Sequence, residues 1–135
     1  MFSKKEKIEN ETNKYKNKAM EFINHQQKID ELMEQAKSKA KERKNSLGDV
    51  LGKLELLIEL IKSYSKGEYR NISKNTMATV IGAILYFVSP IDMIPDFIIG
   101  LGFVDDAAVI SFAVKKISGE LNEYDKWKKR QNPLE

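Results

Sequence analysis

The pattern of hydrophobic and polar positions predicts an all-α protein, a small bundle of about four helices. From Ser3 to Asn45 the chain has neither glycine nor proline and consists mostly of strong helix formers. Within this run, mostly apolar and small residues repeat every seven positions, with a second set four residues after each member of the first. The two sets are Ile8, Tyr15, Phe22, Ile29 and Ala36, and then Thr12, Ala19, Gln26, Met33 and Ala40. We therefore predict a long, charged N-terminal helix with one narrow stripe.

A continuous helix over this run would be about 60 Å long, which is longer than a domain of this size is wide. Two arrangements remain open. In the first, the stripe covers the core of the protein itself, and roughly the first ten residues are disordered. In the second, residues 1–46 form a charged helical arm that self-associates, or binds a protein partner, as a coiled coil.

The segment after Asn45 predicts a second, amphipathic helix. Lys53, Glu55, Glu59 and Lys62 face away from its apolar side, and the helix is expected to stop at a glycine, Gly67. The spacing of its apolar residues is typical of a helix that packs on a core. These residues are Leu47, Val50, Leu51, Leu54, Leu57, Ile58, Ile61 and Tyr64.

A third helix follows, with Ser73 or Asn75 as its N-terminal cap and an end near Val88. Residues 77–88 are apolar or small on every side. Such a helix is either the buried centre of a bundle or embedded in lipid. Burial is the simpler account, because charged amphipathic helices are available to cover it.

The last predicted helix begins near residue 104, passes residue 118 and ends in the basic residues 126–130. Cations are favourable at this end of a helix because they complement its dipole. We expect this helix and the third to form a central apolar hairpin. Tyr86 and Trp127 are expected to be aromatic side chains of the core or its edge.

The composition narrows the chemistry that is available. A chain of 135 residues, 41% hydrophobic and 32% charged, is sufficient for one domain with one modest core. The lack of cysteine excludes a disulfide framework, a thiolate metal site and a cysteine nucleophile, and it indicates a reducing cytoplasm. The single histidine, His25, excludes a multi-histidine metal site within one chain.

The net charge of +3 is unevenly distributed. Residues 1–46 carry twelve basic and eight acidic side chains, whereas residues 76–114 carry no basic and four acidic side chains. Mixed lysine and glutamate along a helix favour a solvated surface over a nucleic-acid interface, which would be more one-sided. The longest charge-free run, residues 75–91, contains about a dozen strictly apolar residues, fewer than the roughly 20 that span a bilayer. Residues 1–18 are alternately charged and do not form a secretory signal.

The most unusual stretch is Tyr86 to Asp106, which we call the Pro-Asp segment. It holds two of the three prolines, two of the seven glycines and four carboxylates. Each proline pushes the residue before it out of the α region, so the third helix is expected to end here. We select as candidate functional residues of this segment Tyr86, Ser89, Pro90, Asp92, Pro95, Asp96, Gly102, Asp105 and Asp106.

The order of residues in this segment also resembles a known family. The run Ser89-Pro90-Ile91-Asp92, Ile94-Pro95-Asp96 and Leu101-Gly102, with Tyr86 before it and Asp105-Asp106 after it, is similar to the signature of the YkvA-like family, a bacterial domain of unknown function. The resemblance spans about residues 71–114. It implies a small helical fold in a bacterial cell, with no established activity. Some members of the family look membrane-associated, which adds a membrane hypothesis.

The four aspartates, Asp92, Asp96, Asp105 and Asp106, have two interpretations. As caps and first-turn residues they would accept backbone N–H bonds, each typically worth about 1 kcal/mol, and would need no ligand. As a group they would repel unless a distant basic residue or a hard cation such as Mg²⁺, Mn²⁺ or Ca²⁺ neutralised them. A metal held there could activate water on a phosphate ester, but a phosphate-binding glycine-rich loop and paired histidines are both missing.

The sequence thus favours a non-enzymatic interaction module, in the cytoplasm or peripheral to the inner membrane, with the Pro-Asp segment as a structural staple or partner contact. Residues 47–130 would be the core domain, and residues 131–135 a disordered tail in which Leu134-Glu135 resembles a tag remnant. The alternatives are a carboxylate-metal hydrolase of phosphate esters and a membrane-inserted helical hairpin.

Overall fold

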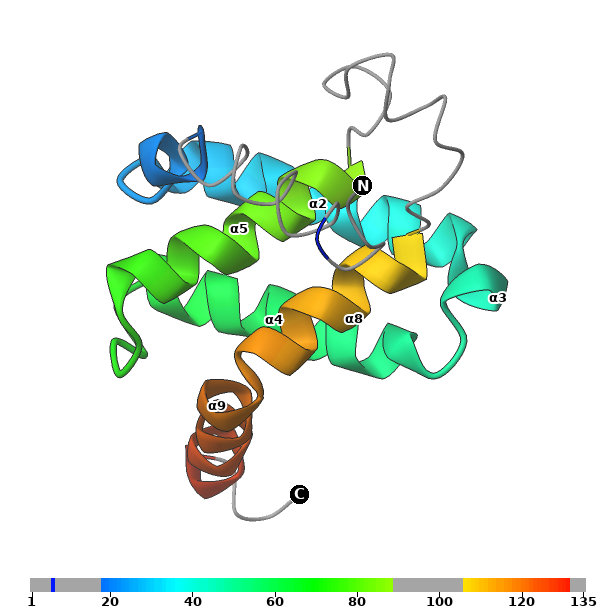
Figure 1. Ribbon diagram of the computed structural model, residues 1–135. Coiled ribbons are helices and arrows are strands. Elements are labelled where there is room, and N and C mark those ends of the chain that lie inside the picture. Colours follow the sequence, from blue (N-terminus) through cyan, green and yellow to red (C-terminus); the bar gives the residue numbers. More distant parts are fainter. Residues whose placement is uncertain (1–5, 7–17, 89–105, 132–135) are drawn as a thin grey trace.

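The computed structural model describes residue 6, residues 18–88 and residues 106–131, and in these ranges it contains helices and no strand. The prediction of an all-α bundle is confirmed (Figure 1). Residues 18–22 are also helical. The elements labelled in Figure 1 are α2 (Gln26–Glu42), α3 (Lys44–Leu47), α4 (Val50–Ser65), α5 (Lys74–Val88), α8 (Asp106–Lys116) and α9 (Ser118–Gln131).

The stripe predicted for the N-terminal run covers the core of the protein itself along α2. Ile29, Met33, Ala36 and Ala40 are all buried, and α2 lies against α4 and α5. A coiled-coil arm built from the same stripe would compete with this packing. Self-association through residues before Lys18 stays a prediction, because those positions lie outside the described part of the chain apart from residue 6.

The N-terminal helical run differs from the prediction in one respect, since it is interrupted at residues 23–25. There the N–H of His25 donates to the carbonyl of Phe22 at 2.9 Å, which closes a turn before α2 begins. Asn24 is a poor helix former in the middle of this turn. Phe22 and Ile23 pack against the core, so the turn keeps both apolar side chains on the bundle.

The amphipathic second helix is confirmed as α4. Its predicted apolar side is buried at Leu54, Leu57 and Ile61, and also at Ile58 and Tyr64. The chain then leaves the helix through a Schellman motif, in which the N–H of Gly67 donates to the Tyr64 carbonyl and that of Glu68 to the Ser63 carbonyl. Gly67 has φ of 79°, as a left-handed terminating residue requires.

Two glycines of this region therefore have opposite expected responses to alanine. Gly67→Ala is expected to lower the free energy of unfolding by about 1–2 kcal/mol, because a side chain is strained at positive φ. Gly52→Ala is expected to raise it by roughly 1 kcal/mol, since Gly52 lies inside α4 and a Cβ there would meet nothing within 4 Å. Urea denaturation of both variants measures the difference. Equal effects of the same sign would contradict the assigned end of α4.

The apolar third helix, α5, is the buried centre of the bundle. Ser73 caps it, because its Oγ accepts the N–H of Thr76 at 3.0 Å. Every residue from Met77 to Phe87 is buried, and α2, α4 and α8 cover the helix. In the ranges given above, no helix combines the length and hydropathy needed to cross a membrane.

The predicted hairpin partner of α5 is α8, which lies against both α5 and α4. Figure 1 shows α8 running back in roughly the opposite direction to α5. The chain changes direction around Ile117, so the last helix is divided in two, and α9 packs on α4. Leu121 and Tyr124 are the buried residues that hold α9 in place.

Candidate functional site

Most of the candidate residues of the Pro-Asp segment lie outside the described part of the chain. Tyr86 is described, and it is buried at 2% exposure in α5 as a core aromatic residue. Asp106 is the first residue of α8, but its side chain is not described. The residues outside are Ser89, Pro90, Asp92, Pro95, Asp96, Gly102 and Asp105. Within residues 18–88 and 106–131, no group of three acidic or histidine side chains could hold a metal ion. The metal site proposed at the four aspartates stays a prediction, because their side chains lie outside the described part of the chain.

A basic side chain lies at the C-terminal end of α5, where the Pro-Asp segment begins. The ammonium of Lys39 on α2 donates a hydrogen bond to the carbonyl of Phe87, in the last turn of α5. It also lies 5.2 Å from the centroid of the Phe87 ring. A cation at this end of a helix complements the dipole. The charge-free sequence around Phe87 gave no sign of this lysine, which lies 48 positions away along the chain.

A second group of interacting side chains joins α4, the 66–73 connection and α9. Tyr69, Tyr124 and Trp127 form one aromatic cluster, with ring centroids 5.1 to 5.7 Å apart. The hydroxyl groups of Ser63 and Tyr124 are hydrogen-bonded to each other at 2.8 Å. Burial raises the pKa of Tyr124, and the hydrogen bond with Ser63 partly opposes that change. Trp127 is half-buried, which confirms its prediction as an edge aromatic residue.

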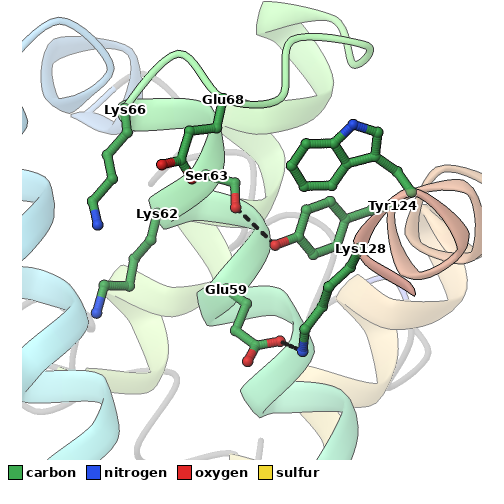
Figure 2. A pocket seen from close by; sticks show the side chains of 8 residues that line it. Glu59, Lys62, Ser63, Lys66, Glu68, Tyr124 and Lys128 are labelled. Carbon is green, nitrogen blue, oxygen red and sulfur yellow. Dashed lines mark hydrogen bonds and ion pairs between the residues drawn. The ribbon is translucent and has the colours of Figure 1, made fainter. Parts of the chain in front are cut away.

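A pocket of about 340 Å³ lies beside this cluster, between α4 and α9 (Figure 2). We call it the α4–α9 pocket. Its wall combines aromatic rings, one serine and five charged side chains, so it differs from the mostly apolar interior of the bundle. The lining residues are Glu59, Lys62, Ser63, Lys66, Glu68, Tyr124, Trp127 and Lys128.

The charges around this pocket are only partly matched. Lys128 of α9 pairs with Glu59 of α4, and the hydrogen bond that Lys128 donates to Glu59 raises the pKa of Lys128. Lys62 has a lowered pKa, first because the Lys37 ammonium of α2 lies close to it and then because Lys62 is partly buried. Lys66 follows Lys62 by one helical turn, and its positive charge acts on Lys62 in the same direction.

This pocket could not be predicted from the local sequence pattern. Lys62 and Glu59 were correctly placed away from the apolar side of α4, but that position also suits an ordinary solvated residue. The partners that complete the pocket come from α9, and Ser63 and Tyr124 are 61 positions apart. Tyr124 and Trp127, three residues apart on one helix, were the only pattern that pointed to an aromatic surface.

Comparison with known proteins finds a family match in the region of α5 and α8. Residues 76–112 match the model of a family described as "Protein of unknown function (DUF1232)". The chain is 41% identical over 70 residues to "Uncharacterized membrane protein YkvA" of Bacillus subtilis (strain 168). This alignment covers 52% of the present chain and 66% of that relative, just under two thirds of its length. No solved structure matches. The resemblance seen in the Pro-Asp segment is therefore confirmed.

Proposed function

Because residues 76–112 match the DUF1232 family model and the chain is similar to YkvA over 70 residues, we propose that it is a non-enzymatic helical module that docks on the surface of a membrane. The observation that carries the proposal is the burial of α5. Among the described helices this is the one that is apolar on every side, and α2, α4 and α8 cover it. A membrane would therefore meet the outer surface of the bundle and not its apolar helix.

The outer surface of α9 has the residue types that such docking requires. Its last turn carries Lys128, Lys129 and Arg130, of which Lys128 is paired with Glu59 and Lys129 with Asp125. Trp127, in the wall of the α4–α9 pocket, is half-buried just before them. Lysine and arginine are attracted to anionic headgroups by about 1 kcal/mol each, and tryptophan is enriched at the interface between membrane and water. The relative is named a membrane protein, which agrees with this interpretation.

In this proposal the Pro-Asp segment is a staple between α5 and α8. Its two flanking helices pack on each other, and Phe87 is fully buried with its carbonyl bound by Lys39. The segment therefore connects two helices that pack in the bundle. A role as a protein contact, with the aspartates facing basic side chains of a partner, is the other form of the same hypothesis. The carboxylate-metal hydrolase stays a prediction about Asp92, Asp96, Asp105 and Asp106.

Co-sedimentation with lipid vesicles tests the membrane proposal. We expect the full chain to sediment with vesicles of phosphatidylglycerol and to remain in the supernatant with phosphatidylcholine. If three basic residues take part, the two partition coefficients should differ on the order of a hundredfold at low salt. Raising the salt concentration should weaken binding, because ions screen exposed charges. Equal partitioning into both vesicle types, or none into either, would overturn the proposal.

A further inference from the structure

The α4–α9 pocket is lined by three lysines and two glutamates, and within the described residues only Lys128 of these lysines is in an ion pair. Among the residues that the structure describes, neither Lys62 nor Lys66 has a carboxylate within the 4.0 Å of an ion pair. Figure 2 shows both side chains extending from neighbouring turns of α4 to the same side, away from Tyr124. Like charges one turn apart destabilise a helix slightly, whereas Lys62 in the last turn of α4 and Lys66 at its C-cap complement the helix dipole.

A third ammonium approaches from α2. Lys37 lies close to Lys62, and its own partner is Glu34, with Nζ and Oε1 3.7 Å apart on exposed side chains. Glu34 offsets part of the repulsion on Lys62. On the other side of the pocket, Glu59 is occupied by Lys128. Three lysines and two glutamates line the pocket itself, which leaves a net positive charge beside the aromatic wall.

From this arrangement we propose that the α4–α9 pocket binds a phosphate group, held by the ammonium groups of Lys62 and Lys66 in a pocket that Trp127 also lines. Lysine is a compact point charge that suits phosphate oxygens. The Ser63 and Tyr124 hydroxyls share one hydrogen bond, so one of their two hydrogens is not used in that bond and is available for an oxygen acceptor. A volume of about 340 Å³ suits a diphosphate or a lipid headgroup.

Two sources could supply this phosphate: an anionic lipid headgroup or a soluble phosphate compound. If the ligand is a lipid headgroup, this inference rests on the proposed membrane docking and adds the pocket as the site where the headgroup binds. The second does not depend on membrane binding. Trp127 is the only tryptophan of the chain and lies in the pocket wall, so its fluorescence reports on either ligand.

The experiment titrates the full chain with inorganic pyrophosphate at constant ionic strength, follows Trp127 fluorescence, and repeats the phosphatidylglycerol sedimentation. The test variants are Lys66→Gln and the double variant Lys62→Gln/Lys66→Gln. The matched control is Lys53→Gln, which removes an exposed lysine from the same helix. Circular dichroism establishes that each variant is folded. We expect saturable pyrophosphate binding that weakens on the order of tenfold or more in the double variant, by a smaller factor in Lys66→Gln, and not in the control.

The outcomes separate the two proposals. Loss of both pyrophosphate and vesicle binding in the double variant supports the pocket with a lipid headgroup as its ligand. Loss of pyrophosphate binding alone supports the pocket for a soluble phosphate and places membrane docking on another surface. A folded protein with no saturable pyrophosphate response, or one equally strong in the double variant, overturns the pocket proposal. Vesicle binding by the unmodified chain would then still support the proposed function.

Discussion

Replacement of Phe87 by alanine is expected to lower the free energy of unfolding by about 3–5 kcal/mol. Phe87 is fully buried in α5, where α2, α4 and α8 cover the helix. Removing its ring leaves a cavity that close-packed neighbours fill only in part. The ring also lies beside the Lys39 ammonium, so the variant loses that contact as well. Urea denaturation followed by circular dichroism measures the change.

Phe112 provides the matched control on the facing helix, α8. Its side chain is half-buried, and the Lys116 ammonium lies 5.5 Å from the ring centroid. Phe112→Ala removes the same atoms from a partly hydrated position, so a clearly smaller loss is expected. Similar losses for the two variants would contradict the central place of α5 in the core. So would a Phe87→Ala protein as stable as the unmodified chain.

Met33→Ala has the second largest expected effect, a loss of about 2–5 kcal/mol. Met33 belongs to the seven-residue stripe of the N-terminal run and is fully buried in α2. Because this stripe packs on α4 and α5 of the same chain, the loss should not depend on protein concentration. An association arm would give a different result, since the stability of an oligomer rises with concentration.

Met20 is the matched control because it is 43% exposed. Met20→Ala is expected to change stability by no more than about 0.5 kcal/mol, as is usual for surface positions. Both variants are to be unfolded in urea at two protein concentrations that differ by a large factor. A Met33→Ala effect that appears only at high concentration would show that the stripe serves association instead of the core.

The fold could be predicted from the sequence because its signals are local. The spacing of Leu54, Leu57 and Ile61 identified the buried side of α4, and Gly67 marked its end. The uniform apolarity of residues 77–88 identified the central helix, since charged amphipathic helices were available to cover it. Each of these inferences depends on residues within one or two turns of each other.

The α4–α9 pocket and the anchor of α5 could not be predicted because their partners are distant in sequence. Lys128 and Glu59 are 69 positions apart, and Lys39 reaches Phe87 across 48. Lys62 and Lys66 have the same local pattern whether they face open solvent or border a pocket. The break at residues 23–25 was also missed, because the run contains neither of the usual helix breakers, glycine and proline. The candidate residues of the Pro-Asp segment remain predictions, except for the buried Tyr86.

The central claim is that the bundle stays closed and meets a membrane with its outer surface. Hydrogen exchange of the chain bound to phosphatidylglycerol vesicles tests it most directly, because exchange reports local opening of each helix. We predict that the amides of α2 and α4 that pack on α5 keep their exchange rates, while exchange slows in α9 and the last turn of α4. Failure to bind the vesicles, or exchange in α2 and α4 that accelerates tenfold or more on binding, would contradict the claim.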